Sequence, residues 1–379
     1  MTSMRARPDG PGTGSAPTYQ TVTARLGDIL EQNDYDFDRI PAQLSQQGQG
    51  WHAIFNPDAS RQISLQLVKE FDQQSSFHIT DVAFSPDGHY LAWRNGGAAH
   101  VCAANNQRGW PKVGDFPDSS ISHGVWPEGP QPLFFSPDSR LVATGGEECH
   151  VLIWSVEDGS CKHKIPAHNG GVRSLAFSKE GNVLASGGGD DVVCLWDVSS
   201  GELVDEIAVE GVVYSTAWSP DGKLLAASSG SDITVWDAGT KAVLRRFGAD
   251  EHGHSDLVAS LVFSPCGKKL ISGGFDNLIK VWSLEGDEPR EWALSLQLEG
   301  QEGLICSLAV TPDGRWLLSG SKARNLMFWN LQDGHAQALL SAFKNTVTGI
   351  DVSLQDGLIA TSCADGIIRL WSYEKYDMS

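Results

Sequence analysis

The feature that most constrains the fold is a hairpin that recurs along the chain with its ends kept and its turn changed. One copy is LISGGFDNLIKVW at 270–282, and close copies are LASGGGDDVVCLW at 184–196 and IATSCADGIIRLW at 359–371. Each copy has two apolar, strand-like stretches around a tight turn and ends on a tryptophan. Regular recurrence of one hairpin predicts a chain built from repeats of one structural unit.

The closing tryptophans set the length of the repeat. They are spaced by 42, 40, 46, 47 and 42 residues, at Trp154, Trp196, Trp236, Trp282, Trp329 and Trp371. A second mark resembling FSPDG occurs seven times, at 84–88, 135–139, 177–181, 218–222, 263–267, 310–314 and 352–357. Its proline presets the first turn position and its glycine adopts the left-handed conformation that closes the turn. Alternating apolar residues on both sides predict four strands per repeat.

A period of about 40–45 residues with four strands and W-D or G-H pairs is typical of a WD-repeat β-propeller. Trp196-Asp197 is a W-D pair and Gly253-His254 is a G-H pair. The pattern therefore predicts an all-β fold, a seven-bladed WD-repeat β-propeller over 51–376. Residues 1–50 are expected to be a short, flexible and largely disordered extension, and 104–131 a long loop.

A ring of blades must close to remove its exposed strand edges. The last repeat ends soon after Trp371 and leaves little room for a fourth strand. The segment SLQLVKEF, 64–71, precedes the first full repeat and is strand-like. We expect 64–71 to supply the outer strand of the blade formed by 347–371.

Composition excludes several classes of function. The formal net charge is −19, without a cluster of Lys and Arg, which disfavours direct binding of nucleic acid. The seven cysteines are scattered without a C-x-x-C pair, which argues against disulfides or a zinc site and favours the cytoplasm or nucleus. The sequence shows neither an apolar signal region nor an apolar run of about 18 residues, so we expect no membrane segment.

Two repeats carry the same four residues at matched positions: His168, Ser186, Asp190 and Trp196, then His254, Ser272, Asp276 and Trp282. Ser, His and Asp together can perform acyl transfer. They can also form a buried hydrogen-bond chain from Trp through Ser and His to Asp, which satisfies groups otherwise left unpaired. Other repeats lack the full set, which favours the structural role. We therefore predict no catalytic residues, no metal and no cofactor.

Several segments resemble the fungal Tup-type transcriptional corepressors, which are relatives of Groucho. They are WHAIFNP at 51–57, the repeats that begin at Pro166 and Gly253, and SGSKARNLMFW at 319–329. The likeness covers about 51–375. The family also has an N-terminal helical oligomerisation module, and only about 50 residues precede Trp51 here. We expect that module to be missing, TVTARLGDILEQ (21–32) to make at most three turns of helix, and the protein to be monomeric on its own.

The resemblance implies that partners bind the narrow face around the central channel. Loops and a turn expected on that face hold His78, Asn169, Asp256, Phe275 and Lys344. In the family pattern H-x-x-x-V-Y-S-V, an aromatic residue often opens the innermost strand. The equivalent positions of this sequence include Thr80, Arg173, Tyr214 and Thr348. Only Tyr214 is aromatic there, and Phe275 is the candidate apolar anchor of an interface.

The function predicted is a non-catalytic scaffold for protein–protein interaction. The resemblance implies a nuclear, Tup-like corepressor whose partners include DNA-bound repressors or a TPR-repeat corepressor. A general WD-repeat scaffold outside transcription, such as a G-protein β-like or complex-assembly subunit, is the alternative. A ubiquitin-ligase receptor is disfavoured because Trp196 is followed by Asp-Val-Ser rather than W-D-x-R.

Overall fold

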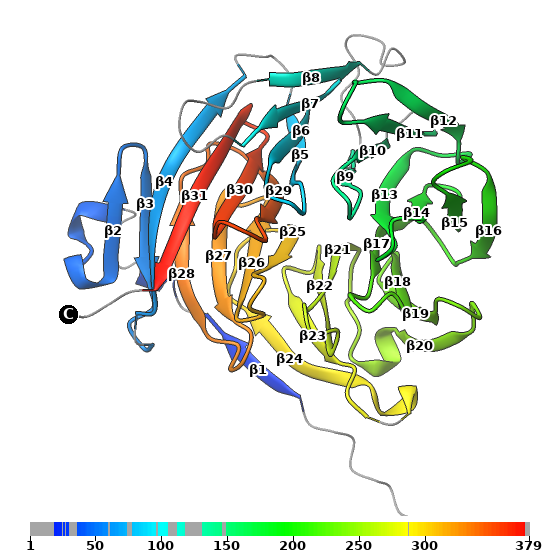
Figure 1. Ribbon diagram of the computed structural model, residues 1–379. Helices are drawn as coiled ribbons and strands as arrows, with labels where there is room; N and C mark the ends of the chain where they lie inside the picture. Colours follow the sequence, from blue (N-terminus) through cyan, green and yellow to red (C-terminus); the bar gives the residue numbers. More distant parts are fainter. Residues whose placement is uncertain are drawn as a thin grey trace, which may run out of the picture.

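The computed structural model describes residues 19–24, 26, 28–29, 36–59, 61–73, 78–95, 98–104, 112–117, 131–145, 149–286 and 288–375. Within these residues the strands form seven sheets, antiparallel apart from one parallel pair at the edge of one sheet, arranged as blades around a central axis (Figure 1). The predicted all-β, seven-bladed propeller is confirmed. No helix in this part of the chain is long and apolar enough to cross a bilayer.

The first four blades follow the chain in order, and each runs from an innermost to an outermost strand. They contain β5 (Ile79–Phe84), β6 (Tyr90–Asn95), β7 (Ala98–Ala103) and β8 (Lys112–Pro117); β9 (Leu133–Phe135), β10 (Leu141–Gly145), β11 (His150–Ser155) and β12 (Cys161–Pro166); β13 (Val172–Phe177), β14 (Val183–Gly188), β15 (Val192–Asp197) and β16 (Leu203–Ala208); β17 (Val213–Trp218), β18 (Leu224–Ser229), β19 (Asp232–Asp237) and β20 (Val243–Phe247).

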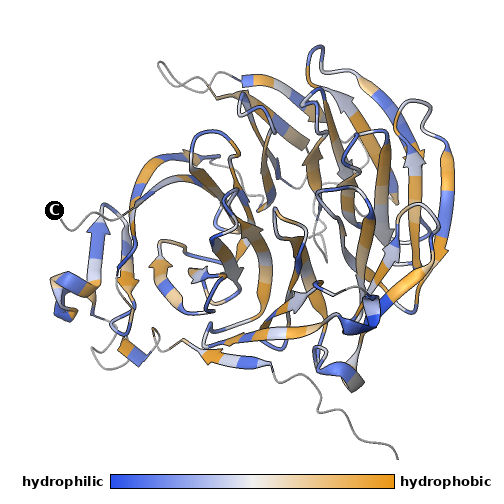
Figure 2. Cartoon of the chain, turned by 60° about the horizontal axis from the view of Figure 1, so that its bottom comes forward, coloured by the Kyte–Doolittle hydropathy of each residue, from blue (hydrophilic) through white to orange (hydrophobic). Residues whose placement is uncertain are grey.

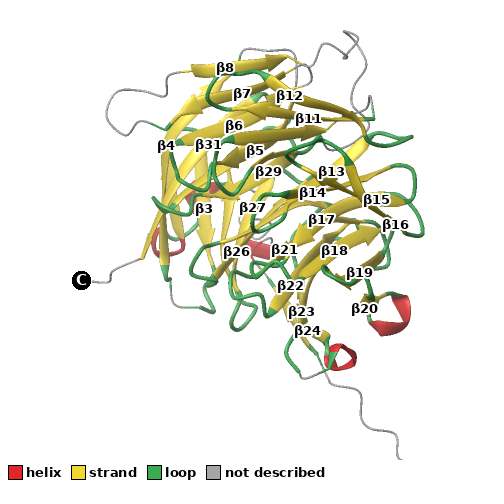
Figure 3. Cartoon of the chain, turned by 45° about the vertical axis from the view of Figure 1, so that its right-hand side comes forward, coloured by secondary structure: helices red, strands yellow, loops and turns green. Residues whose placement is uncertain are grey.

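The last three blades also include strands from the N-terminal part of the chain. They contain β21 (Val258–Phe263), β22 (Lys269–Gly274), β23 (Ile279–Ser283), β24 (Ala293–Glu299) and β1 (Gln20–Thr23); β25 (Ile305–Val310), β26 (Trp316–Ser321), β27 (Asn325–Asn330), β28 (Ala336–Ser341), β3 (Trp51–Phe55) and β2 (Ser45–Gly48); β29 (Val347–Val352), β30 (Leu358–Cys363), β31 (Ile367–Lys375) and β4 (Ile63–Asp72). Short 3-10 turns are η1 (Phe37–Arg39), η2 (Ala42–Leu44), η3 (Ala249–Glu251) and η4 (Pro289–Glu291), and strands dominate the rest (Figure 3).

The FSPDG-like mark makes the turn between the first and second strands of a blade. In blade 4 the Ser219 hydroxyl donates to Asp221 Oδ1 at 2.6 Å and accepts the Leu224 N–H at 2.9 Å. Gly222 closes the turn at φ 78°, a left-handed conformation that favours glycine. Each residue of the mark thus has a local role, which explains why it recurs. Figure 2 shows hydrophobic residues along the strands that these turns connect.

The predicted closing segment lies within β4, which pairs antiparallel with β31 over nine residue pairs from Ile63↔Lys375 to Asp72↔Ile367. Leu65 is fully buried in the core shared by blades 6 and 7. Trp51 meets Trp371 edge to face, with ring centres 5.7 Å apart. Strands from both ends of the described chain therefore share one blade, as Figure 1 shows for the blue and red strands.

Residues 1–50, predicted as a largely disordered extension, contain regular structure in their described part. Residues 20–23 form β1, which pairs with β24, and 45–48 form a hairpin with β3. The boundary drawn at residue 51 therefore falls inside a hairpin. The helix predicted over 21–32 is confirmed only in part: Thr21–Thr23 are extended in β1, with Val22 buried against blades 5 and 6, whereas Leu26, Asp28 and Ile29 are helical. Residues 1–18 and 30–35 lie outside the described residues.

The long loop predicted at 104–131 also needs a correction. Residues 112–117 form β8, the outermost strand of blade 1, which pairs with β7 from Ala98↔Pro117 to Cys102↔Lys112. Phe116 is buried and stacks on Trp154 of the next blade, with ring centres 5.5 Å apart. A single buried aromatic among polar residues carries too weak a period to indicate a strand from sequence. Residues 105–111 and 118–130 lie outside the described residues.

Candidate functional site at the narrow face

Two sets of connections lie at the same end of the blades. They are the loops that enter the innermost strands and the turns between the second and third strands. Hydrogen bonds join them: the Asn169 N–H donates to Asp190 Oδ2 at 2.7 Å, and the Phe275 N–H donates to the Leu257 carbonyl at 2.7 Å. We call the surface formed by these loops and turns the narrow face.

The innermost strands surround a central channel with a volume of about 640 Å³. Thr80, Arg173, Tyr214 and Thr348 all line this channel, so four of the nine predicted partner-binding residues converge there. The Arg173 guanidinium carbon lies 5.5 Å from the Tyr214 ring centre, which is a cation–π distance. These two side chains give one side of the channel a charged and aromatic character.

The other five predicted residues lie on the loops and turns of the narrow face. Asn169, Asp256 and Lys344 are exposed, while His78 and Phe275 are half-buried. A hydrogen bond joins His78 Nδ1 to the Ala364 carbonyl oxygen in the turn of the neighbouring blade. Phe275 is not among the strongly exposed large apolar side chains of the described residues. Its role as an interface anchor stays a prediction.

The predicted hydrogen-bond chain is present in blades 3 and 5. In blade 5, Trp282 Nε1–H donates to Ser272 Oγ at 2.9 Å, Ser272 Oγ lies 2.7 Å from His254 Nε2, and His254 Nδ1 lies 2.9 Å from Asp276 Oδ1. The same chain in blade 3 joins Trp196, Ser186, His168 and Asp190 with links of 2.8, 2.7 and 2.8 Å.

Burial decides the chemistry of this chain. Ser272 is fully buried between Trp282 and His254, so a substrate cannot approach its hydroxyl. Burial lowers the pKa of His254 and favours the neutral imidazole. Burial acts to raise the pKa of Asp276, but hydrogen bonds from His254 and backbone N–H groups outweigh it and hold the pKa below its ordinary range. The hydrogen-bond chain therefore holds in place the turn between the second and third strands of the blade.

Blade 6 contains a version of this chain that the sequence patterns above do not identify. Gln301 takes the position of the histidine, and the Ser319 hydroxyl donates to its Oε1. The Gln301 amide donates to Asn325 Oδ1 at 3.0 Å, while Trp329 Nε1–H donates to Ser319 Oγ at 2.8 Å. Gln301 lies 18 residues before Ser319, the same separation as His168 and Ser186. That spacing is the signal that could have found it.

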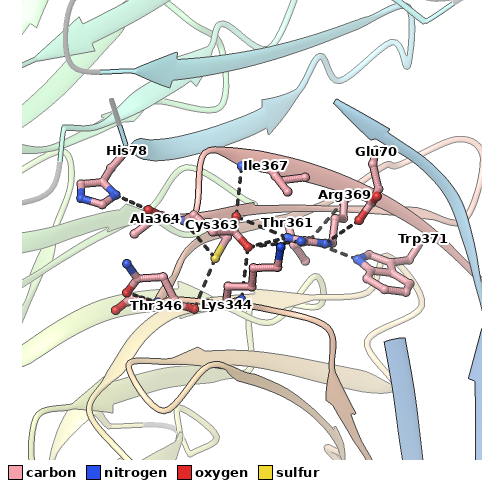
Figure 4. A network of polar contacts seen from close by, with 12 residues as sticks. Glu70, His78, Lys344, Thr346, Thr361, Cys363, Ala364, Ile367, Arg369 and Trp371 are labelled. Carbon is pink, nitrogen blue, oxygen red and sulfur yellow. Dashed lines mark hydrogen bonds and ion pairs between the residues drawn. The ribbon is translucent and has the colours of Figure 1, made fainter. Parts of the chain in front are cut away.

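Blade 7 replaces the histidine by Phe343, and an arginine takes over the polar contacts (Figure 4). The Arg369 guanidinium donates to Asp365 Oδ2 at 3.2 Å and to Glu70 Oε1 at 2.9 Å. Trp371 Nε1–H still donates to Thr361 Oγ1, at 3.1 Å. Because Glu70 belongs to β4 and Arg369 to β31, this nearly buried cation also joins the two strands that close the ring.

Comparison with known proteins agrees with this geometry. The family model described as "WD domain, G-beta repeat" matches more than half of the chain, at 65–92, 133–155, 159–197, 206–237, 245–283, 292–330 and 334–372. The chain belongs to the WD40 repeat family. It is also similar to chicken (Gallus gallus) WD repeat-containing protein 1, with 33% identity over 91 residues. That match covers 23% of this chain and 13% of the relative's length.

A WD40 propeller is typically a scaffold that binds other proteins. Among the described residues, no three His, Cys, Asp or Glu side chains are grouped so that they could hold a metal ion.

Side-chain hydroxyls join the innermost strands of neighbouring blades in this WD40 ring. Ser215 Oγ accepts the Leu261 N–H at 3.0 Å, and Ser260 and Ser307 repeat the contact with the next strands. Carboxylates take this role on both sides of blade 1. Asp351 Oδ2 accepts the Phe84 N–H at 2.7 Å, and Asp81 Oδ2 accepts the Leu133 N–H at 2.9 Å. Burial raises the pKa of Asp81 to about 7 and that of Asp351 to about 6.

Replacing Asp81 by serine tests what this buried carboxyl does to stability. An unfolded aspartate loses its proton near pH ~4, whereas folded Asp81 holds its proton up to about pH 7. Because the folded state binds more protons between these values, Asp81 makes the free energy of unfolding fall as pH rises through them. We expect D81S to weaken that fall in urea denaturation measured at intervals between pH ~5 and ~8.

The matched control is Asp221, a turn carboxylate in blade 4. The hydrogen bond from the Ser219 hydroxyl holds the pKa of Asp221 below its ordinary value, so it titrates below this pH range. The free energy of unfolding of D221S should therefore change with pH in parallel with that of the wild type. If the free energy of unfolding of D81S also changes with pH in parallel with that of the wild type, Asp81 does not hold its proton up to about pH 7 in the folded state.

Proposed function

We propose that this WD40 protein is a non-catalytic, Tup-like corepressor scaffold that acts in the nucleus and binds partner proteins through its narrow face. The observation that carries the proposal is the convergence of Thr80, Arg173, Tyr214 and Thr348 on one central channel. Arg and Tyr are enriched among residues that dominate binding energy in protein interfaces. The partners proposed are DNA-bound repressors or a TPR-repeat corepressor.

The surroundings of the channel support a site for a protein rather than for a small molecule alone. Asn169, Asp256 and Lys344 are exposed on the same face and come from three different blades. A partner that contacts all three would span the channel mouth and place its central residues against Arg173 and Tyr214. Polar residues around a more buried centre are the usual anatomy of a protein interface.

The test is affinity purification of the full chain followed by mass spectrometry. Arg173→Glu should reduce recovery of the partner about tenfold, the effect of losing roughly 1.4 kcal/mol of binding energy, and Phe275→Ala should reduce it if that ring is an anchor. Lys162→Glu is the control, because Lys162 is an exposed cation on the outermost strand β12. Unchanged recovery with R173E would exclude the channel mouth as the binding site.

The identity of the recovered protein separates the two functions considered. Repressors or a TPR-repeat protein would support the corepressor role. Subunits of a complex unrelated to transcription would favour the general WD-repeat scaffold, with the narrow face still as the binding surface.

A further inference from the structure

One position near the start of the innermost strands carries a charge. The seven positions that correspond to one another there hold Thr80, Gln131, Arg173, Tyr214, Ala259, Cys306 and Thr348. Arg173 is the charged residue of this set, and it lines the central channel close to the narrow face. A single cation at this level of the channel can distinguish one kind of partner side chain from another.

The guanidinium of Arg173 has no acceptor in the described part of the chain. Arg173 is half-buried, and its Nε is shielded from solvent without a hydrogen-bond partner. No ion pair joins it to a described carboxylate. The other buried or half-buried arginines among the described residues, Arg61, Arg94, Arg245 and Arg369, each pair with a polar or charged side chain. Because a half-buried cation without an acceptor is unfavourable, an anion supplied by a partner would gain a contact that this chain does not supply.

Neighbouring contacts fix the place of this cation. The guanidinium carbon of Arg173 lies 5.5 Å from the Tyr214 ring centre. In the next position of each strand, Ser174 Oγ accepts the N–H of Thr216 at 2.6 Å and lies 2.9 Å from Thr216 Oγ1, which joins β13 to β17. A guanidinium that packs on an aromatic ring keeps its N–H edge available for a planar acceptor. A donor held in place also loses less conformational entropy when a partner binds.

The other charged groups of the channel favour a single negative charge at Arg173. Asp81 and Asp351 line the channel on blades 1 and 7, and each accepts two backbone N–H groups. Lys179 also lines the channel, but it lies in the turn between β13 and β14, at the opposite end from the narrow face. Proteins recognise a phosphate dianion with clusters of arginine. One cation in a channel that also contains two carboxyls matches a carboxylate better.

We propose that the partner of the narrow face inserts an Asp or Glu side chain into the channel mouth, where its carboxylate binds the Arg173 guanidinium beside Tyr214. The inference rests on the function proposed above and adds the chemistry of the partner's central residue. A carboxylate fits the fork of a guanidinium with two parallel N–H···O bonds. Because the protein has a net charge of −19, a strongly acidic segment would be repelled. The partner's segment therefore carries this one acidic residue among neutral or basic ones.

A phage-displayed library of random linear peptides, selected on the immobilised full chain, tests this chemistry. Peptides selected on the wild type should share an Asp or Glu at one position, whereas peptides selected on Arg173→Glu should carry Lys or Arg there. Arg140→Glu is the matched control and should select the same peptides as the wild type. Arg140 is exposed and follows the turn between β9 and β10, at the opposite end of the ring.

A double-mutant cycle then measures the contact itself. A synthetic copy of a selected peptide, and a version whose acidic residue is replaced by the matching amide, are titrated against the wild type and Arg173→Gln by fluorescence polarisation. The amide should weaken binding to the wild type at least about tenfold, a difference of ~1.4 kcal/mol, and binding to R173Q less than about twofold. The comparison on the wild type needs no variant, so it decides the question even if R173Q does not fold.

Two results would overturn the inference, and they differ in what they mean for the proposed function. If R173E abolishes peptide binding but the amide version binds the wild type as tightly as the acid, the channel mouth is the site and does not recognise a carboxylate. If no peptide is enriched whose binding depends on Arg173, the channel mouth is not the binding site, and the proposed function fails together with the inference.

Discussion

Replacing Leu65 by alanine is expected to lower the free energy of unfolding by about 2–5 kcal/mol, the usual effect of truncating a fully buried leucine. Leu65 is 1% exposed and lies in β4, opposite Tyr373 of β31. It packs in the core shared by blades 6 and 7, at the junction where the chain closes on itself. Urea denaturation followed by tryptophan fluorescence measures the change.

The same strand offers a matched control for this prediction. Val68 also lies in β4 but is 49% exposed, so V68A should change the free energy of unfolding by no more than about 0.5 kcal/mol. If L65A and V68A have equal effects, β4 does not carry the buried contacts of the closing blade. The ring would then be held by the other contacts between blades alone.

Replacing Asp276 by alanine is the second large change, with an expected loss of about 1–3 kcal/mol from the unpaired groups it leaves. Its carboxylate accepts from the Ser255 N–H at 3.0 Å and the Leu278 N–H at 3.1 Å, besides its contact with His254. All three lose their partner in D276A. Thermal and urea denaturation should both show the loss.

Asp256 is the control for this change, because it is exposed on the same narrow-face loop and, among the described residues, accepts only from the adjacent Leu257 N–H. D256A should stay within about 0.5 kcal/mol of wild type. The pair also distinguishes the two roles considered for Ser, His and Asp. Loss of a hydrolytic activity in D276A without loss of stability would favour catalysis over the structural chain.

The repeat itself could be predicted from sequence because its determinants are local. The serine and tryptophan of the hydrogen-bond chain are 10 residues apart, and the histidine precedes the serine by 18. The turn at Ser219–Gly222 is held by side-chain hydrogen bonds between residues two and five positions apart. Such contacts leave a spacing that recurs with the repeat. The need for a closing strand could also be seen, because the last repeat is one strand short.

Other parts of the site carry no such spacing. The sequence pattern requires a histidine and therefore does not include Gln301, whose side-chain amide makes the hydrogen bonds of the histidine with a different functional group. Asp81 and Asp351 were not singled out either, since serine holds the matched junctions and each carboxylate contacts a different blade. Phe275 looked like an exposed anchor, but its half-buried position depends on how the neighbouring loop folds.

By itself, the sequence determined the number of blades, the strand order within a repeat and the buried hydrogen-bond chains that end at Trp196 and Trp282, because each depends on residues within about forty positions of one another. Only the tertiary structure decided where the N-terminal residues lie. Val22 and Leu298 are 276 positions apart and meet because the ring brings the edge of blade 5 beside the start of the chain. Val22 and Ala24 bury their side chains only if such an edge is present, and no local pattern in the sequence indicates that it is.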